Sequence, residues 1–184
     1  MSLRGGIGLP ELPIKDGREF RLGIMGGTFD PIHYGHLVTA EQARESLDLD
    51  AVLFMPAGSP AFKLDKPVTP AEDRYAMTVL ATAANPAFLA SRFEIDRAGV
   101  TYTADTLHAL REFYPPQVKL YFITGADAII DIVTWHNADE IAELATFIAA
   151  TRPGFDIDTA RARIKESGLP FDCLLYTSPS PRDA

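Results

Sequence analysis

The chain has 184 residues, of which 47% are hydrophobic and 23% charged, and its 17 basic and 25 acidic side chains give a formal net charge of −8. These proportions are globular, because a disordered chain is less apolar and a membrane bundle is less charged. The length predicts a single domain. The acidic balance argues against a protein that coats nucleic acid, which needs a basic surface, but it leaves room for a small anionic ligand bound by local groups.

Cysteine content and hydropathy predict where the protein works. Cys173 is the only cysteine, which excludes an intrachain disulfide and a zinc site made of four cysteines. The strongest apolar run, Leu144–Ala150, is far shorter than the ~18 residues that span a bilayer. The first twenty residues contain no apolar region typical of a signal peptide. We therefore expect a cytoplasmic protein with neither a membrane nor a nucleic-acid partner.

Apolar runs alternate with helical patterns along the chain, after a leader over residues 1–19 that we expect to be flexible because it is rich in glycine, proline and charge. In chain order the sequence predicts a strand over Phe20–Met25, a helix over His33–Leu47, a strand over Ala51–Met55, a long loop over Pro56–Pro70, a helix from Pro70 to about Ala84, a strand over Phe88–Ile95, a helix over Ala104–Phe113, a strand over Val118–Thr124, a helix from Asn137 to about Leu144, a strand over Thr146–Thr151 and a helix over Asp158–Ser167.

Three of these helices carry capping signals. Thr69 followed by Glu72, and Asn137 followed by Glu140, have the three-residue spacing of a capping box. Thr103 is the predicted N-cap of the helix that follows it.

Strands and helices that alternate in this way predict an α/β fold of one domain, a doubly wound, Rossmann-like parallel sheet with helices on both faces. Ligands bind such sheets outside the carboxyl ends of the strands. The strand-to-helix turns at Gly26–His36, Gly125–Asp127 and Thr151–Gly154 are therefore the expected places for a site.

The first of these turns is the richest in chemistry. Gly26 and Gly27 allow a ligand to approach the backbone closely, and the N-terminus of the following helix offers N–H groups to a phosphate. His33 and His36 are three residues apart, so both imidazoles point the same way and can donate to that phosphate. Gly35 between them removes a side chain that would crowd the ligand.

This turn has two other interpretations. In the first, the glycines simply form a tight turn and both histidines make their hydrogen bonds within the protein, so no ligand is involved. The histidines could also be half of a metal site, but His108 and His136 are the only other histidines and neither supplies a suitable ligand pattern. The concentration of these features in eleven residues at a strand–helix junction favours phosphate binding.

The run Gly26-Gly27-Thr28-Phe29-Asp-Pro-Ile-His33-Tyr-Gly35-His36 resembles the signature of the HxGH nucleotidylyltransferase superfamily and, within it, of the bacterial nicotinate-nucleotide adenylyltransferases. Those enzymes join ATP and nicotinate mononucleotide into deamido-NAD and pyrophosphate. Further segments are similar to the same family in the same order, and together they cover about residues 20–170. These segments are Pro56–Lys63, Arg97–Leu107, Phe122–Asp127, Trp135 and Arg152–Gly154.

The resemblance implies a role for each matching residue. His33 and His36 are implied to be catalytic, and the implied partners are ATP and nicotinate mononucleotide, with Mg²⁺ carried by ATP and no metal ligand from the protein. The implied nucleotide-binding residues are Gly26, Gly27, Thr28, Phe29, Gly35, Gly125, Asp127 and Arg152. The implied substrate-binding residues are Lys63, Tyr102, Thr103, Thr106 and Trp135.

Simpler roles remain open for several of these residues. Trp135 could pack in the core instead of stacking on a pyridinium ring. Lys63 could be a solvated surface lysine, Asp127 a helix cap and Arg152 an exposed turn residue. Thr103 can cap its helix and contact a ligand at the same time.

The C-terminal end departs from the family. Relatives carry a Ser-Ser/Thr-x-x-Arg motif that binds the triphosphate, and in its place this chain ends in Phe171–Ala184, where Pro179 and Pro181 oppose a helix start. We expect a truncated domain over residues 20–173 followed by a non-native tail over residues 174–184. Two alternatives follow: a related enzyme with another phosphate acceptor, or an inactive fragment that binds mononucleotide without the triphosphate loop.

Overall fold

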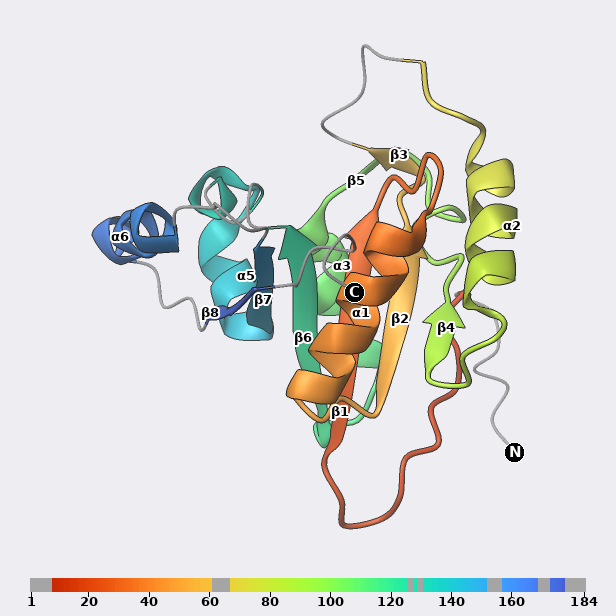
Figure 1. Cartoon of the computed structure of the whole chain (residues 1–184), viewed down its shortest axis with the longest axis horizontal. Coiled ribbons are helices and arrows are strands. Elements are labelled where there is room, and N and C mark those ends of the chain that lie inside the picture. The colour runs from red at the N-terminus through yellow and green to blue at the C-terminus, as the bar shows by residue number, and fades with distance from the viewer. Residues whose placement is uncertain are drawn as a thin grey trace.

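The structure is a computed structural model that describes residues 8–60, 67–125, 128, 131–151, 157–168 and 173–177 (Figure 1). Its elements are β1 (Phe20–Gly27), α1 (Tyr34–Ser46), β2 (Ala51–Pro56), β3 (Ser59–Pro60), α2 (Ala71–Thr82), β4 (Phe88–Ala90), β5 (Val100–Thr101), α3 (Thr103–Phe113), β6 (Val118–Gly125), the short 3₁₀ helix η2 (Ile132–Thr134), α5 (Ala138–Leu144), β7 (Thr146–Thr151), α6 (Ile157–Ser167) and β8 (Cys173–Thr177).

The described strands form a six-stranded sheet in the order β4-β2-β1-β6-β7-β8, in which every neighbouring pair is parallel. A second small sheet pairs β3 with β5. The strand order reverses between β1 and β6, which is the hallmark of a doubly wound sheet. The predicted fold class is therefore confirmed.

Helices cover both faces of this sheet, and Figure 1 shows α1 in front of it and α3 behind it. Each strand can pack against helices on both sides, because successive side chains along a strand point to opposite faces of the sheet. Leu22 and Ile24 of β1 pack in the cluster that contains the α3 residue Leu107, whereas Met25 packs in the cluster that contains Ala40 of α1. Because these strands are buried on both faces, their sequences are the continuous apolar runs from which the strands were predicted.

The predicted strand over Phe88–Ile95 is wrong after its first three residues. β4 ends at Ala90, because the Ser91 hydroxyl donates to the Gly8 carbonyl at 2.7 Å and accepts from the Phe93 N–H at 3.1 Å. These bonds turn the chain away from the sheet. The apolar pattern could not reveal them, since Gly8 lies more than eighty residues away in the sequence.

The predicted capping boxes are also wrong. α2 begins at Ala71 with Pro70 as N-cap and no side-chain cap, while the Glu72 carboxylate pairs with Arg92 at 2.7 Å. Asn137 is the N-cap of α5 as predicted, but its side chain makes no capping bond, and Glu140 contacts His108 instead. Both carboxylates, of Glu72 and Glu140, contact residues that are more distant in the sequence than the helix starts they were expected to cap.

α3 begins one residue earlier than predicted. Tyr102 is its N-cap and Thr103 its first helical residue, and no side chain caps it.

Part of the predicted leader lies against the domain. Leu9, Leu12 and Ile14 pack on the core cluster of the α3 side, and the Tyr114 hydroxyl donates to the Pro10 carbonyl at 2.7 Å. The leader over residues 1–19, which we expected to be flexible, therefore packs on the domain along this stretch. At the other end, the predicted boundary between residues 173 and 174 falls within β8, a strand that the sequence did not predict. Residues 1–7 and 178–184 lie outside the described residues.

None of the described helices combines the length and hydropathy that a membrane span requires.

Candidate functional site

The candidate site lies where β1 and β6 end side by side. These two strands pair in parallel, so Gly27 and Gly125, their last residues, lie at the same edge of the sheet. This edge is the switch point of the strand order, where ligands bind in doubly wound sheets. Beside Gly125 the space is open toward the described residues, since a Cβ built there would meet none of their heavy atoms within 4 Å.

His33 and His36 flank the start of α1. His33 is the N-cap residue, and its backbone N–H donates to Nδ1 of His36 at 3.2 Å. The two rings stack with their centroids 3.9 Å apart and their planes 26° from parallel. Because Nδ1 of His36 accepts a hydrogen bond, the proton of the neutral ring lies on Nε2. The pair is therefore close together, as the sequence spacing predicted.

His36 is a neutral donor near pH 7. Burial, and then the charge of His33, lower the pKa of His36 to about 4. The ring of Phe29 packs edge-on against the imidazole, with centroids 5.1 Å apart and planes at 90°. The imidazole can therefore present an Nε2–H to a phosphate, and it is a poor general base because its pKa is so low.

The glycines of this turn make room for rings as well as for a ligand. A Cβ at Gly27 would lie 3.1 Å from the Phe29 ring, and one at Gly35 would lie 3.0 Å from the His33 ring. Phe29 itself is 3% exposed and has a left-handed φ of 49°. Gly35 was expected to clear space for the ligand, and the structure adds that it clears space for His33.

Behind the turn lies a buried cation that sequence reasoning missed. Arg74 of α2 is 1% exposed and donates to three backbone carbonyls, one of them that of Thr28 at 2.7 Å. The sequence signal was the spacing of Arg74, Thr78 and Thr82, which recur every four residues and are all buried. A search for apolar periodicity overlooks this stripe because all three side chains are polar.

The predicted substrate-binding residues gather near the start of α3. Tyr102, its N-cap, lies against His136 with ring centroids 4.6 Å apart. Trp135, the residue before His136, is half-buried and meets Phe122 edge-on at 6.2 Å. The structure thus brings together Tyr102, Thr103 and the neighbourhood of Trp135.

Thr106, in the first turn of α3, is buried. Its hydroxyl donates to Oε1 of Glu94 at 2.7 Å, so the substrate contact implied for this side chain stays a prediction. Glu94 is a second buried charged residue that the sequence analysis missed. Three further predicted site residues, Lys63, Asp127 and Arg152, lie outside the described residues.

Glu94 predicts a pH-dependent stability. Burial raises the pKa of Glu94 to about 7, although the bond from Thr106 and the charge of Arg97 oppose the shift. The folded protein then holds the Glu94 proton more tightly than the unfolded chain does. The stabilisation that this proton provides is complete below about pH 4.5 and is lost as the pH rises through 7. We expect the free energy of unfolding of the wild type, relative to Glu94→Gln, to fall by about 3 kcal/mol between pH 4.5 and 8. Urea unfolding of both proteins across this range measures the difference, and a constant difference would contradict the expectation.

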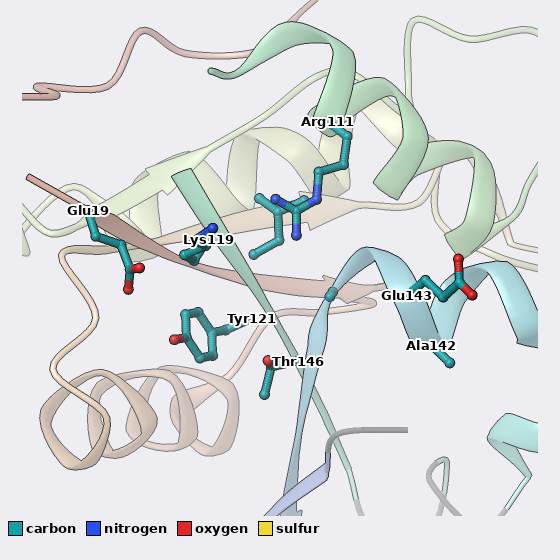
Figure 2. A pocket seen from close by; sticks show the side chains of 9 residues that line it. Glu19, Arg111, Lys119, Tyr121, Ala142, Glu143 and Thr146 are labelled. Atoms are coloured by element: carbon teal, nitrogen blue, oxygen red, sulfur yellow. The ribbon is translucent and has the colours of Figure 1, made fainter. Parts of the chain in front are cut away.

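A cavity of about 420 Å³ lies at the opposite edge of the sheet (Figure 2). Its lining includes Glu19, Lys119 and Thr146, which lie at the amino ends of β1, β6 and β7. Arg111 extends into this region from α3 and donates to the carbonyls of Leu144 and Val118. The cavity is therefore remote from the histidine turn.

The geometry agrees with the comparisons to known proteins. The sequence profile of the cytidylyltransferase-like family matches residues 24–177, so the fold and the histidine turn define a member of this nucleotidylyltransferase class.

Proteins named probable nicotinate-nucleotide adenylyltransferase are similar over most of the chain. The one from Moorella thermoacetica is 59% identical over 150 residues, which are 82% of this chain and 67% of that protein. The one from Salinispora arenicola is 55% identical over 82% of this chain and 76% of that protein. The chain belongs to the nicotinate-nucleotide adenylyltransferase family.

Coverage and solved structures complete the comparison. The chain spans about two thirds of the length of the Moorella thermoacetica relative and of several others. The nicotinic acid mononucleotide adenylyltransferase of Plasmodium falciparum complexed with NaAD superposes with a TM-score of 0.72 at 23% identity, over 88% of this chain and 77% of that chain. A putative nicotinate-nucleotide adenylyltransferase from Vibrio parahaemolyticus superposes with a TM-score of 0.61 at 20% identity, over 85% of this chain and 98% of that chain. At these identities the likeness is one of fold.

Proposed function

We propose that the protein transfers the adenylyl group of ATP to nicotinate mononucleotide, giving deamido-NAD and pyrophosphate. The observation that carries the proposal is the neutral His36 ring at the start of α1, beside the edge where β1 and β6 end. Membership of the family supports the choice of substrates.

In the proposed reaction a phosphate oxygen of nicotinate mononucleotide attacks the α-phosphorus of ATP in line. One P–O bond forms, the bond to the oxygen that bridges to the β-phosphate breaks, and pyrophosphate leaves with that oxygen. The attacking phosphate is already an anion and needs no strong base, which agrees with the low pKa of His36. His33, the His36 Nε2–H and the first N–H groups of α1 would stabilise the charge that builds up on the α-phosphate oxygens.

We propose that ATP carries Mg²⁺ into the site, where the ion would offset the charge of the β- and γ-phosphates, since protein sites usually share this ion with substrate phosphates and water. Within the ranges that the structure describes, no three His, Cys, Asp or Glu side chains gather into a metal site. The proposal names no protein ligand for the ion. We also propose a cytoplasmic location, which cell fractionation would test.

The pyridine end of the substrate would lie between Trp135 and the start of α3. An indole face attracts a pyridinium ring by about 0.5–2 kcal/mol, and the helix N-terminus favours the carboxylate of nicotinate. We expect Trp135→Ala to raise the KM for nicotinate mononucleotide about 2- to 30-fold and to leave the KM for ATP within 2-fold or so. Trp135→Phe, which keeps an aromatic face, is the control. Equal changes in both KM values would contradict a stacking role.

A pyrophosphate-release assay with several acceptors tests the function itself. The expected result is rapid release with nicotinate mononucleotide and slow release with nicotinamide mononucleotide or phosphopantetheine. Preference for another acceptor would identify a related transferase. Binding of nicotinate mononucleotide by calorimetry, with no deamido-NAD formed after Mg-ATP is added, would identify a binding protein without activity.

A further inference from the structure

We propose that Arg74 is a positioning residue for the adenylyl transfer described above, holding the histidine turn in place relative to the loop after β2. This inference rests on the proposed function only for its effect on turnover. Its geometric part concerns contacts within the folded chain and can be tested without any reaction.

Arg74 is almost completely buried, and its guanidinium spreads over three backbone carbonyls. It donates to Thr28 at 2.7 Å, to Thr69 at 2.8 Å and to Gly58 at 3.1 Å. These carbonyls belong to three separate segments: the turn after β1, the loop after β2 and the residues just before α2. An arginine suits this task because its planar fork presents donors in several fixed directions.

The charge of Arg74 is balanced locally. Burial lowers the pKa of Arg74, and the charge of Asp30 opposes that shift. Asp30 is two residues beyond Thr28, and its carboxylate accepts from the Thr69 N–H at 3.0 Å. Arginine stays protonated at any working pH, so a buried cation lies directly behind the turn.

One set of contacts leads from Arg74 to His36. Thr28, whose carbonyl Arg74 holds, immediately precedes Phe29. The Phe29 ring packs edge-on against the half-buried His36 imidazole and covers part of it. Loss of the bond to Thr28 would therefore release Phe29 and expose the imidazole.

A second set leads from Arg74 to α3. Gly58, which also accepts from Arg74, lies against the backbone carbonyl of Glu94. The Glu94 carboxyl accepts from Thr106 in the first turn of α3. Arg74 thus connects the histidine end of the site to the helix that would bind the pyridine end. A displacement of about 1 Å between two such groups can lower turnover about 100-fold.

Arg74→Lys (R74K) tests the proposal, because it keeps the positive charge and loses the three-way fork. The readout is the titration of His36, followed by NMR of its ring protons. We expect the wild-type pKa of about 4 to rise by a unit or more in R74K, since Phe29 no longer shields the ring. We also expect kcat to fall about 10-fold or more, with the KM for ATP changed less.

Thr82→Val is the matched control. Its hydroxyl donates to the carbonyls of Thr78 and Val79 inside α2, so the variant weakens the same helix without touching Arg74 or its acceptors. It should lower the melting temperature and leave the titration of His36 unchanged. If R74K does not fold, the double variant R74M/D30N, which removes one charge of each sign, supplies the same comparison.

The outcomes separate the two proposals. A wild-type titration of His36 and a wild-type kcat in R74K would overturn the positioning role. A changed titration in R74K and in T82V alike would mean that any weakening of α2 has this effect, and would overturn it too. A changed titration in R74K alone, together with a wild-type protein that forms no deamido-NAD, would support the positioning role and refute the proposed function.

Discussion

Replacing His36 by alanine is expected to lower kcat about 100- to 1,000-fold, the loss typical when one donor to a developing oxyanion is removed. The substitution removes the Nε2–H donor of His36. In the wild type, the hydrogen bond from the His33 N–H to Nδ1 of His36 keeps the ring proton on Nε2. A contact that strengthens as charge develops affects kcat more than KM. Steady-state kinetics at saturating ATP and nicotinate mononucleotide measure the change.

His36→Gln is the matched control for this prediction, because the amide keeps an N–H donor on a side chain of similar reach. It should retain more activity than the alanine variant. Turnover of His36→Ala within a few-fold of the wild type would refute the role of His36. In the wild type, the pKa of about 4 means that titration of His36 leaves kcat unchanged between pH 6 and 8.

Placing a single methyl group on Gly58 is expected to damage both stability and activity. The new Cβ of Gly58→Ala would overlap the backbone carbonyl of Glu94 and lie 3.3 Å from the Ile95 Cα. Backbone cannot rotate away as a side chain can, so the loop after β2 must move. Forced shifts of this kind cost about 1–3 kcal/mol. Because the Gly58 carbonyl also accepts from Arg74, kcat/KM should fall about 10-fold or more.

Ser59→Ala is the control for Gly58→Ala. Ser59 is the next residue, is exposed, and begins β3, so shortening it adds no volume to the interior. Thermal unfolding and steady-state kinetics of both variants test the prediction. A Gly58→Ala protein as stable and active as Ser59→Ala would show that the loop has room for a side chain.

The histidine turn could be predicted from sequence because its signals are local. Gly26, Gly27 and Gly35 mark positions where a side chain would crowd a neighbouring ring. The spacing of His33 and His36 places both of their rings on one helical turn. The sheet was predicted for a related reason, since strands buried on both faces leave continuous apolar runs. Its parallel pairing agrees with the crossover connections expected of alternating strands and helices.

Arg74 and Glu94 could not be predicted in the same way. A charged residue is usually exposed, and only the folded chain shows that three carbonyls surround Arg74 or that Thr106 faces Glu94. Glu72 had the spacing of a helix cap, but Arg92 competes for its carboxylate. In each case the deciding partner is distant in the sequence, so no local pattern records it.

The position of β1 in the middle of the sheet has a consequence for biosynthesis. One edge of β1 pairs with β2, which follows soon after it, but the other edge pairs with β6, where Phe20 lies opposite Val118. A separation of about 100 residues corresponds to roughly 5–20 s of translation. During that time the nascent chain carries a buried-type apolar strand with one open edge, next to the glycines of the future site. Because pairing of distant segments is slow, this open edge is available to aggregation and to chaperones until β6 closes onto β1.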